Sequence, residues 1–331
     1  MNRCPVYRTC ALALALAITM AATAQEKSSK SAPIGDGITA RYVKTGLFVV
    51  SGEGGNSVLR LSANGLILVD GELPGNFTAV LRQIRKIDKQ PLRVLVLTSA
   101  DESRIGANQD FLASGAPVVV QQNAKLNRAS VQAASDKAPP AADNQPTSPG
   151  DDDAPSPSGN HSPAPTVTYD REYKIHLGGV DVQLLHFGNA HTGADTVVYF
   201  PNLKAVAVGD LFASAPDPNY AAGGSLVGWG PVLAQVLKLD FDTAVPSQGP
   251  TVTRAEVEAF KGKIDILVSR AGALVSKGVP EDQLMSQLKT DDLGWKLNFT
   301  PAQVEGFYAE LSKSGQSLHA AELKVPAALQ K

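Results

Sequence analysis

Two segments of the chain carry polar residues directly after apolar runs, and their residue types could do chemistry. The first runs from Leu97 to Asn108 and contains hydroxyl, carboxylate and guanidinium groups. The second runs from His186 to Thr196, and a further apolar run ends soon after it with Gly209 and Asp210. Because loops at the ends of buried strands are held by a rigid scaffold, we expect these side chains to converge on one cleft.

The second segment resembles the second half of a metallo-β-lactamase-type hydrolase. The resemblance rests on a Gly-x-Ala-His-Thr element at residues 188–192 and a Val-Gly-Asp element at residues 208–210. The Val-Asp-Gly at 69–71, the helical pattern that starts at Phe77 and the Gly-Ala-Asn at 106–108 follow in the family's order. The resemblance implies an α/β fold, namely an αββα sandwich of two pseudo-equivalent β-rich halves, with helices outside and metals at the sheet edges.

Most of the metal ligands of that family are replaced in this chain. The family uses a Thr-His-x-His-x-Asp-His run, and its four ligand positions here read Ser99, Asp101, Ser103 and Arg104. A hydroxyl is a poor zinc ligand, and a guanidinium has only hydrogen-bond donors. The late Pro-Gly-His-Gly turn of the family is similar to residues 246–249, where Gln248 stands in place of the histidine.

Only His191 and Asp210 match the family's ligand set. Two ligands cannot hold two zinc ions, because a catalytic zinc usually has three protein ligands and an open position. An oxygen of Asp101 could complete a single site, at which an activated water would be the nucleophile. We therefore expect no bound cofactor, with one zinc or other divalent cation at His191, Asp210 and Asp101 as the alternative.

A cleft carboxylate that has lost its metals needs another cation. We expect the Arg104 guanidinium to occupy the vacated space and to pair with Asp210 or Asp101. The other cleft candidates are Ser99, Ser103 and Gln248. The fold would also bring Ser99, Asp101 and His191 together, but positions that point at a shared metal need not form the serial hydrogen bonds of a hydrolytic triad.

Three classes of function are compatible with this pattern. The leading interpretation is an exported pseudo-hydrolase without the dinuclear zinc centre, which binds an unidentified small molecule or protein at the cleft. The first alternative is a hydrolase of an ester, thioester or lactam-type substrate with a reduced single-metal site. The third is a structural protein with a vestigial cleft. Fold alone cannot choose among them.

The elements that position these residues can be predicted from hydrophobic spacing. Short apolar runs and Asn-Gly or Gly-rich turns predict an antiparallel meander over 47–70, and helical spacing from Phe77 to Ile87 predicts a helix before a buried strand at 94–97. Further strands are predicted at 173–177, 180–186, 196–200 and 205–208. Helices are predicted at 253–275, 280–289 and 301–313, the first and last opened by capping residues.

The remaining histidines and the tryptophans favour structural roles. His176 alternates with apolar neighbours and is predicted to face solvent, and His186 ends an apolar strand and is predicted to pack beneath the cleft. Trp229 and Trp295 lie among apolar residues and are predicted to belong to the core or the cleft wall.

The composition of the 331 residues changes along the chain and predicts one exported domain that is interrupted by an insertion. Arg3 and Arg8 precede a short apolar run that predicts a signal peptide at 1–24, followed by a flexible leader at 25–37. The domain spans 38–313, with a disordered insertion rich in Pro, Ala, Ser and Asp at 134–165 and a tail at 314–331. We expect a periplasmic or secreted protein with no membrane span in the mature chain. The net charge of -2 without a basic stripe argues against nucleic acid as a partner.

Deleting residues 135–164 is predicted to leave the thermal unfolding midpoint nearly unchanged. The segment has few apolar groups to bury, and the entropy of loop closure changes only slowly with loop length. Differential scanning calorimetry of the deletion variant beside the full chain measures this. A large drop in the midpoint would show that the segment packs against the domain.

Overall fold

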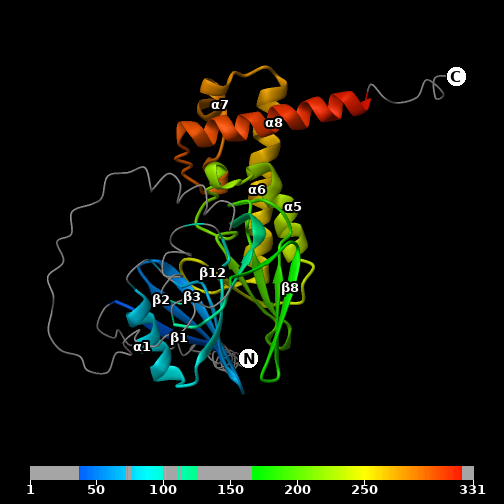
Figure 1. The fold of residues 1–331 in the computed structure, drawn as a ribbon. Coiled ribbons are helices and arrows are strands. Elements are labelled where there is room, and N and C mark those ends of the chain that lie inside the picture. The colour runs from blue at the N-terminus through cyan, green and yellow to red at the C-terminus, as the bar shows by residue number, and fades with distance from the viewer. Residues whose placement is uncertain are drawn as a thin grey trace, which may run out of the picture. The chain divides into compact units, whose positions relative to one another are not determined.

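The computed structural model describes residues 37–71, 73, 76–99, 101, 111, 114–124 and 166–322, with side chains described as far as residue 313. The predicted signal peptide, the leader up to residue 36, the 134–165 insertion, Ser103 and Arg104 lie outside these residues. The described residues form two β-sheets that face each other, with helices on their outer sides (Figure 1). No helix among them is both long and apolar enough to cross a membrane.

The first sheet has seven strands in sequence order. They are β1 (Thr39–Lys44), β2 (Leu47–Gly52), β3 (Gly55–Ser62), β4 (Gly65–Val69), β5 (Leu92–Val96), β6 (Val118–Gln121) and β7 (Thr166–Tyr169). Strands β1 to β4 pair antiparallel, which confirms the predicted meander, and β4 to β7 pair parallel. Parallel strands need long crossovers, and the first crossover contains helix α1 (Phe77–Ile87), as predicted.

The second sheet has six strands in the order β13-β12-β11-β10-β9-β8. They are β8 (Glu172–Leu177), β9 (Val180–Leu185), β10 (Val197–Phe200), β11 (Ala205–Gly209), β12 (Thr243–Pro246) and β13 (Val252–Thr253). Only the β11–β12 pair is parallel. The four strands predicted in this half correspond to β8 to β11 within one residue at each end.

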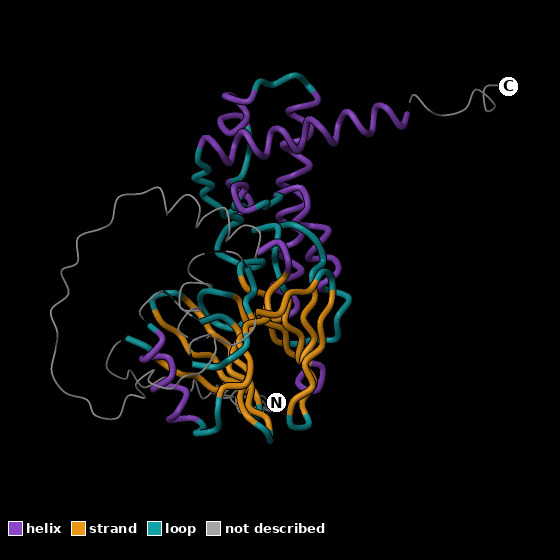
Figure 2. Tube along the Cα trace, viewed as in Figure 1, coloured by secondary structure: helices purple, strands orange, loops and turns teal. Residues whose placement is uncertain are grey.

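The helices of the second half are α5 (Leu226–Val236), α6 (Arg254–Ser276), α7 (Glu281–Gln287) and α8 (Pro301–Glu322). Short 3₁₀ turns occupy Pro201–Leu203, Tyr220–Ala222 and Asp291–Leu293. Helix α6 begins with the predicted capping box, in which Thr253 and Glu256 bond each other's backbone N–H. Figure 2 shows these helices outside the strands of the second sheet.

Within the described residues the core consists of three hydrophobic clusters, and side chains that alternate along a strand belong to different clusters. In β4, Ile67 and Val69 pack between the sheets with Val182 and Leu184 of β9, while Leu66 and Leu68 pack against α1. In β11 the same alternation sends Val206 and Val208 to the cluster that contains α5, α6 and α8. Successive side chains of a strand point to opposite faces, so each sheet is covered on both sides, as an αββα sandwich requires.

Helix α5, five strands and the end of helix α8 differ from the sequence prediction. Helix α5 was not predicted, because its sequence contains Gly228, Gly230 and Pro231 and has no clear polar stripe, and six of its residues are buried. Strands β1, β6, β7, β12 and β13 were also not predicted, since short strands carry little periodicity. Helix α8 continues to Glu322, past its predicted end at 313 and into the segment predicted as a tail. Alanine and glutamate favour helix, so residues such as Ala320, Ala321 and Glu322 extend α8 although they add no apolar stripe that would have predicted it.

A buried asparagine joins the first sheet to the turn after β12. The Nδ2 group of Asn56 in β3 donates hydrogen bonds of 2.9 Å to Pro246 O and 2.9 Å to Gly249 O. Its backbone N–H donates to Ser247 O, and Ser247 N–H in turn donates to Gly209 O. The turn and the end of β11 are therefore fixed to the opposite sheet.

Replacing Asn56 by alanine is expected to lower the free energy of unfolding by about 1–3 kcal/mol, because two carbonyl groups lose a buried donor. Urea denaturation followed by circular dichroism measures the change. The control is Asn298→Ala at an exposed position, for which we expect a change within about 0.5 kcal/mol. Equal stability of both variants would show that Asn56 does not fix this turn.

Candidate functional site

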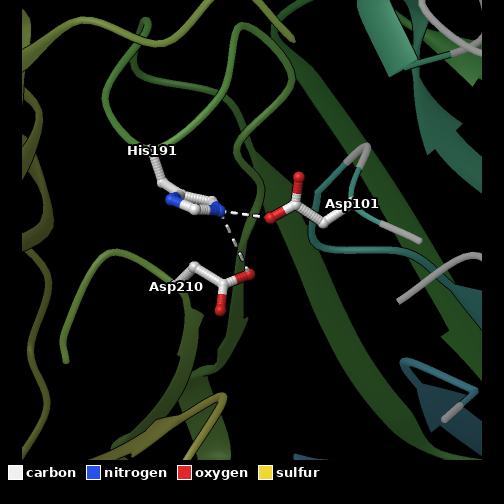
Figure 3. Close-up of side chains that lie close together, drawn as sticks. All are labelled: Asp101, His191 and Asp210. Carbon is white, nitrogen blue, oxygen red and sulfur yellow. Dashed lines mark hydrogen bonds and ion pairs between the residues drawn. The ribbon is translucent and has the colours of Figure 1, made fainter. Parts of the chain in front are cut away.

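Three acidic or basic side chains from separate loops meet where the two sheets approach each other. Asp101 follows β5, His191 lies in the loop between β9 and β10, and Asp210 directly follows β11 (Figure 3). One ligand atom from each residue lies within 4.8 Å of the others. The side chains are only 22, 10 and 16% exposed, respectively, so their charges are partly shielded from water.

His191 is oriented by a backbone carbonyl. Its Nδ1 lies 2.6 Å from Asp217 O, and because a carbonyl oxygen only accepts, Nδ1 carries a proton in this bond. Its Nε2 faces the carboxylates, with Asp101 Oδ2 in hydrogen-bond contact and Asp210 Oδ2 at 3.9 Å. Nε2, which faces the carboxylates, is therefore the nitrogen that can act as a metal ligand.

Each carboxylate also has an orienting partner. The Nδ2 group of Asn219 donates to Asp101 Oδ1 at 2.9 Å, and the Ser99 hydroxyl donates to Asp210 Oδ2 at 3.4 Å. The Oδ1 atom of Asn219 accepts from Ala222 N–H, which fixes the orientation of the amide. The geometry of the three side chains is thus set by neighbours as well as by one another.

The electrostatics of the cluster favour positive charge on His191. Burial by itself lowers the pKa of His191, but the hydrogen bond to Asp101 and the charges of Asp210 and Asp101 outweigh it and raise the pKa to about 10. Without a bound cation, the imidazolium therefore supplies the positive charge that the two carboxylates need.

A buried aspartate holds the His191 loop. Asp195 accepts hydrogen bonds from the backbone N–H groups of Ala190 and Thr192 and from the Thr192 hydroxyl. Burial raises the pKa of Asp195 to about 7, against the opposing charge of His191 and the bonds from Thr192. The loop is further fixed to the first sheet, because Thr196 N–H donates to Thr98 O and Asn123 Nδ2 donates to Gly193 O.

The turn after β5 is held by Asp70, which has a positive φ of 60°. Asp70 accepts from Thr98 N–H at 2.8 Å and from the Thr98 hydroxyl at 2.7 Å, and both residues are buried. A Cβ atom on Gly209 would lie 2.8 Å from Thr98 Oγ1, so glycine is needed for β11 to approach this turn. Asp101 and Asp210 are brought together by this close approach.

The donor set fits one divalent cation. Two carboxylates and one imidazole match the three protein ligands of a catalytic metal site, and their charge of −2 would neutralise the ion. The Nδ1–H group of His191 donates to a backbone carbonyl, the arrangement that usually accompanies ligation through Nε2. Within the described residues, no other group of three histidine, cysteine or acidic side chains meets the same criterion.

The structure brings together some of the site residues that the sequence proposed, but not all of them. Asp101, His191 and Asp210 converge, and Ser99 lies beside them. Both ring nitrogens of His191 bond groups other than Ser99, so the serial bonds of a hydrolytic triad are not formed among the described residues. Gln248 is exposed. Ser103 and Arg104 lie outside the described residues, and the described partners of Asp101 are His191, Asn219 and Ser99.

Trp229, Trp295 and His176 have the predicted kinds of environment. Trp229 is fully buried, donates from Nε1 to Leu211 O and lies edge-on to His191 at 6.2 Å between ring centroids. Trp295 is also buried. His186 bonds Asp195 O through Nδ1, and the His176 side chain is 76% exposed.

Sequence reasoning missed the residues that orient the three side chains. Asp217 and Asn219 lie in the segment between β11 and α5, for which no role was predicted. The sequence Asp217-Pro218-Asn219 does carry a turn signal, because aspartate, proline and asparagine favour turns, but a turn signal does not reveal what the turn contacts.

Comparison of the sequence with known proteins finds one short match. The chain matches no protein-family model. It is 27% identical over 97 residues to the 2,4-dinitroanisole O-demethylase subunit alpha of Nocardioides sp. (strain JS1661), a match that covers 29% of this chain and 30% of that protein. The activity of that protein is therefore not carried over by this match.

Solved structures of metallo-β-lactamases share the fold over most of their length. The enzyme from Pontibacter korlensis has a TM-score of 0.53 at 18% identity, covering 69% of this chain and 99% of its own. DIM-1 has a TM-score of 0.52 at 15% identity, with 69 and 97% coverage. FIM-1 from Pseudomonas aeruginosa in its mono-zinc form has a TM-score of 0.51 at 18% identity, with 69 and 94% coverage. The expected αββα sandwich of metallo-β-lactamase type is thus confirmed.

Replacing Thr98 by valine is expected to lower the free energy of unfolding by about 1.5–3 kcal/mol, because a buried carboxylate loses a hydroxyl donor. Denaturant titration measures this, and Thr168→Val, at an exposed position of β7, serves as the control. If both variants are as stable as the original chain, the Asp70–Thr98 bond does not hold the turn.

Proposed function

We propose that the chain holds one zinc or other divalent cation at Asp101, His191 and Asp210 and hydrolyses an ester, thioester or lactam-type bond. The observation that carries the proposal is the orientation of His191, whose Nδ1–H is bonded to Asp217 O while Nε2 faces both carboxylates. When bound at such a site, a divalent cation supplies Lewis-acid activation of water and of a carbonyl group.

The residues around the three ligands have separate tasks in this proposal. Asn219 and Ser99 hold the two carboxylates in place, and the Asp217 carbonyl holds the imidazole. Trp229 closes one side of His191 with an apolar ring and limits access of water. The mono-zinc form of FIM-1 gives a precedent for one ion on this fold.

A binding or regulatory role without turnover is the second candidate. It is favoured by the replacement of the family's late histidine by Gln248, whose side chain is exposed. A cleft that lacks this ligand has no described group to hold a second ion beside the first. In both candidates we propose that the protein is exported to the periplasm or the exterior, on the basis of the basic residues and apolar run at 1–24.

The full chain, dialysed against trace zinc or manganese, is expected to retain about one ion per chain, because three ligands are present. Elemental analysis measures the ratio, and His191→Gln is expected to abolish retention while His176→Gln, at an exposed histidine, leaves it unchanged. Assays with simple esters, thioesters and lactams then test turnover. Two ions per chain would contradict the single site. One ion without turnover would favour the binding role, and no ion would refute the proposal.

A further inference from the structure

The carbonyl group that orients His191 belongs to a peptide bond that has no N–H group to donate a hydrogen bond. Asp217 O is the oxygen of the peptide between Asp217 and Pro218, and proline has no N–H to donate. The neighbouring Asn219 is held by its own N–H, which donates to His191 O. The Asp217–Pro218 peptide therefore depends on other groups for its position.

Gln303 in the first turn of α8 contacts both residues of this peptide. Its Nε2 group donates to Asp217 Oδ1 at 2.6 Å and to Pro218 O at 3.1 Å. Its Oε1 atom accepts from the backbone N–H and hydroxyl of Thr300, which fixes the orientation of the amide. The Gln303 side chain thus caps the start of α8. It also bonds the side chain of Asp217 and the carbonyl of Pro218, which lie on either side of the Asp217 carbonyl.

Two further residues on the same face of α8 contact the same segment. A Cβ atom on Gly306 would lie 2.6 Å from the Tyr220 ring, so glycine lets that ring pack against the helix. Glu310 Oε2 accepts from the Tyr220 hydroxyl at 2.8 Å and from the first N–H groups of α5 at Leu226 and Val227. Positions three and seven residues apart share a helix face, so α8 contacts the 217–227 segment at successive turns.

The helix is itself fixed in the core. Phe307 and Leu311 are buried in the cluster that contains α5 and α6. A rigid element is thereby connected to His191 through one side chain and one peptide bond. We infer that Gln303 is a positioning residue of the candidate site, which holds the Asp217 carbonyl against His191 and so sets the affinity of the site for its cation.

The effect on cation affinity rests on the proposed function, but the effect on the orientation of His191 does not. Gln303→Glu tests both. Glutamate keeps an oxygen for Thr300 at the start of α8, as in a capping box, but replaces the donor by a carboxylate that repels Asp217 and Pro218 O. Gln287→Glu in α7 makes the same change of charge at an exposed glutamine that bonds only Gln283 among described contacts, and is the matched control.

The first readout is the Nδ1–H resonance of His191 in the metal-free, ¹⁵N-histidine-labelled full chain, assigned by its loss in His191→Gln. We expect a slowly exchanging signal in the original chain and in Gln287→Glu, and its loss in Gln303→Glu at an unchanged unfolding midpoint. Adding Asp217→Asn to Gln303→Glu restores a donor opposite the carboxylate and is expected to recover the signal. An unchanged signal in Gln303→Glu, or an equal loss in Gln287→Glu, overturns the inference.

The second readout is the dissociation constant for zinc alone, measured by competition with a chelator. Changes in the residues that orient metal ligands typically weaken affinity about 10- to 100-fold, which is the loss expected for Gln303→Glu. If the original chain binds no zinc, the proposed function fails and the resonance still decides the role of Gln303. If zinc binds equally well to both, Gln303 does not set the affinity.

Discussion

Two carboxylates a few ångströms apart at the edge of an apolar sandwich require positive charge between them. Asp101 and Asp210 both lie close to His191 Nε2 and are largely shielded from water. Placing like charges together in such a site is unfavourable unless a proton or a cation compensates them. The raised pKa of His191 and the proposed cation are therefore two responses to one constraint, since both place positive charge at the same point.

The sandwich creates this constraint by bringing together loops that its cores hold rigidly. Alternation in β4 and β11 buries both faces of each sheet, and the three side chains of the site lie on loops that follow the strands. Asp70 with Thr98, Asp195 with Thr192, and Asn56 with the 246–249 turn then fix those loops by buried hydrogen bonds. Each of these bonds joins polar groups that would be costly to bury unpaired.

The sequence was sufficient for the fold class and for most elements of the sheets. Period-two and helical spacing identified the meander, α1 and the strands β8 to β11, because those elements each have one distinct apolar face or are bounded by turn residues. The same logic fails for α5, which is apolar nearly all round and contains Pro231. It also fails for β6 and β12, whose four residues are too few to show a period.

At the site, the sequence by itself determined which residue types were available: one matched imidazole, one matched carboxylate and a nearby Asp101, with too few donors for two zinc ions. Only the tertiary structure decided how they are oriented. The Asp217 carbonyl is a backbone group that every residue has, so no pattern marks it. Gln303, which bonds the side chain of Asp217, lies 86 residues away in the sequence. Such contacts depend on the packing of α8 in the core, which local spacing does not encode.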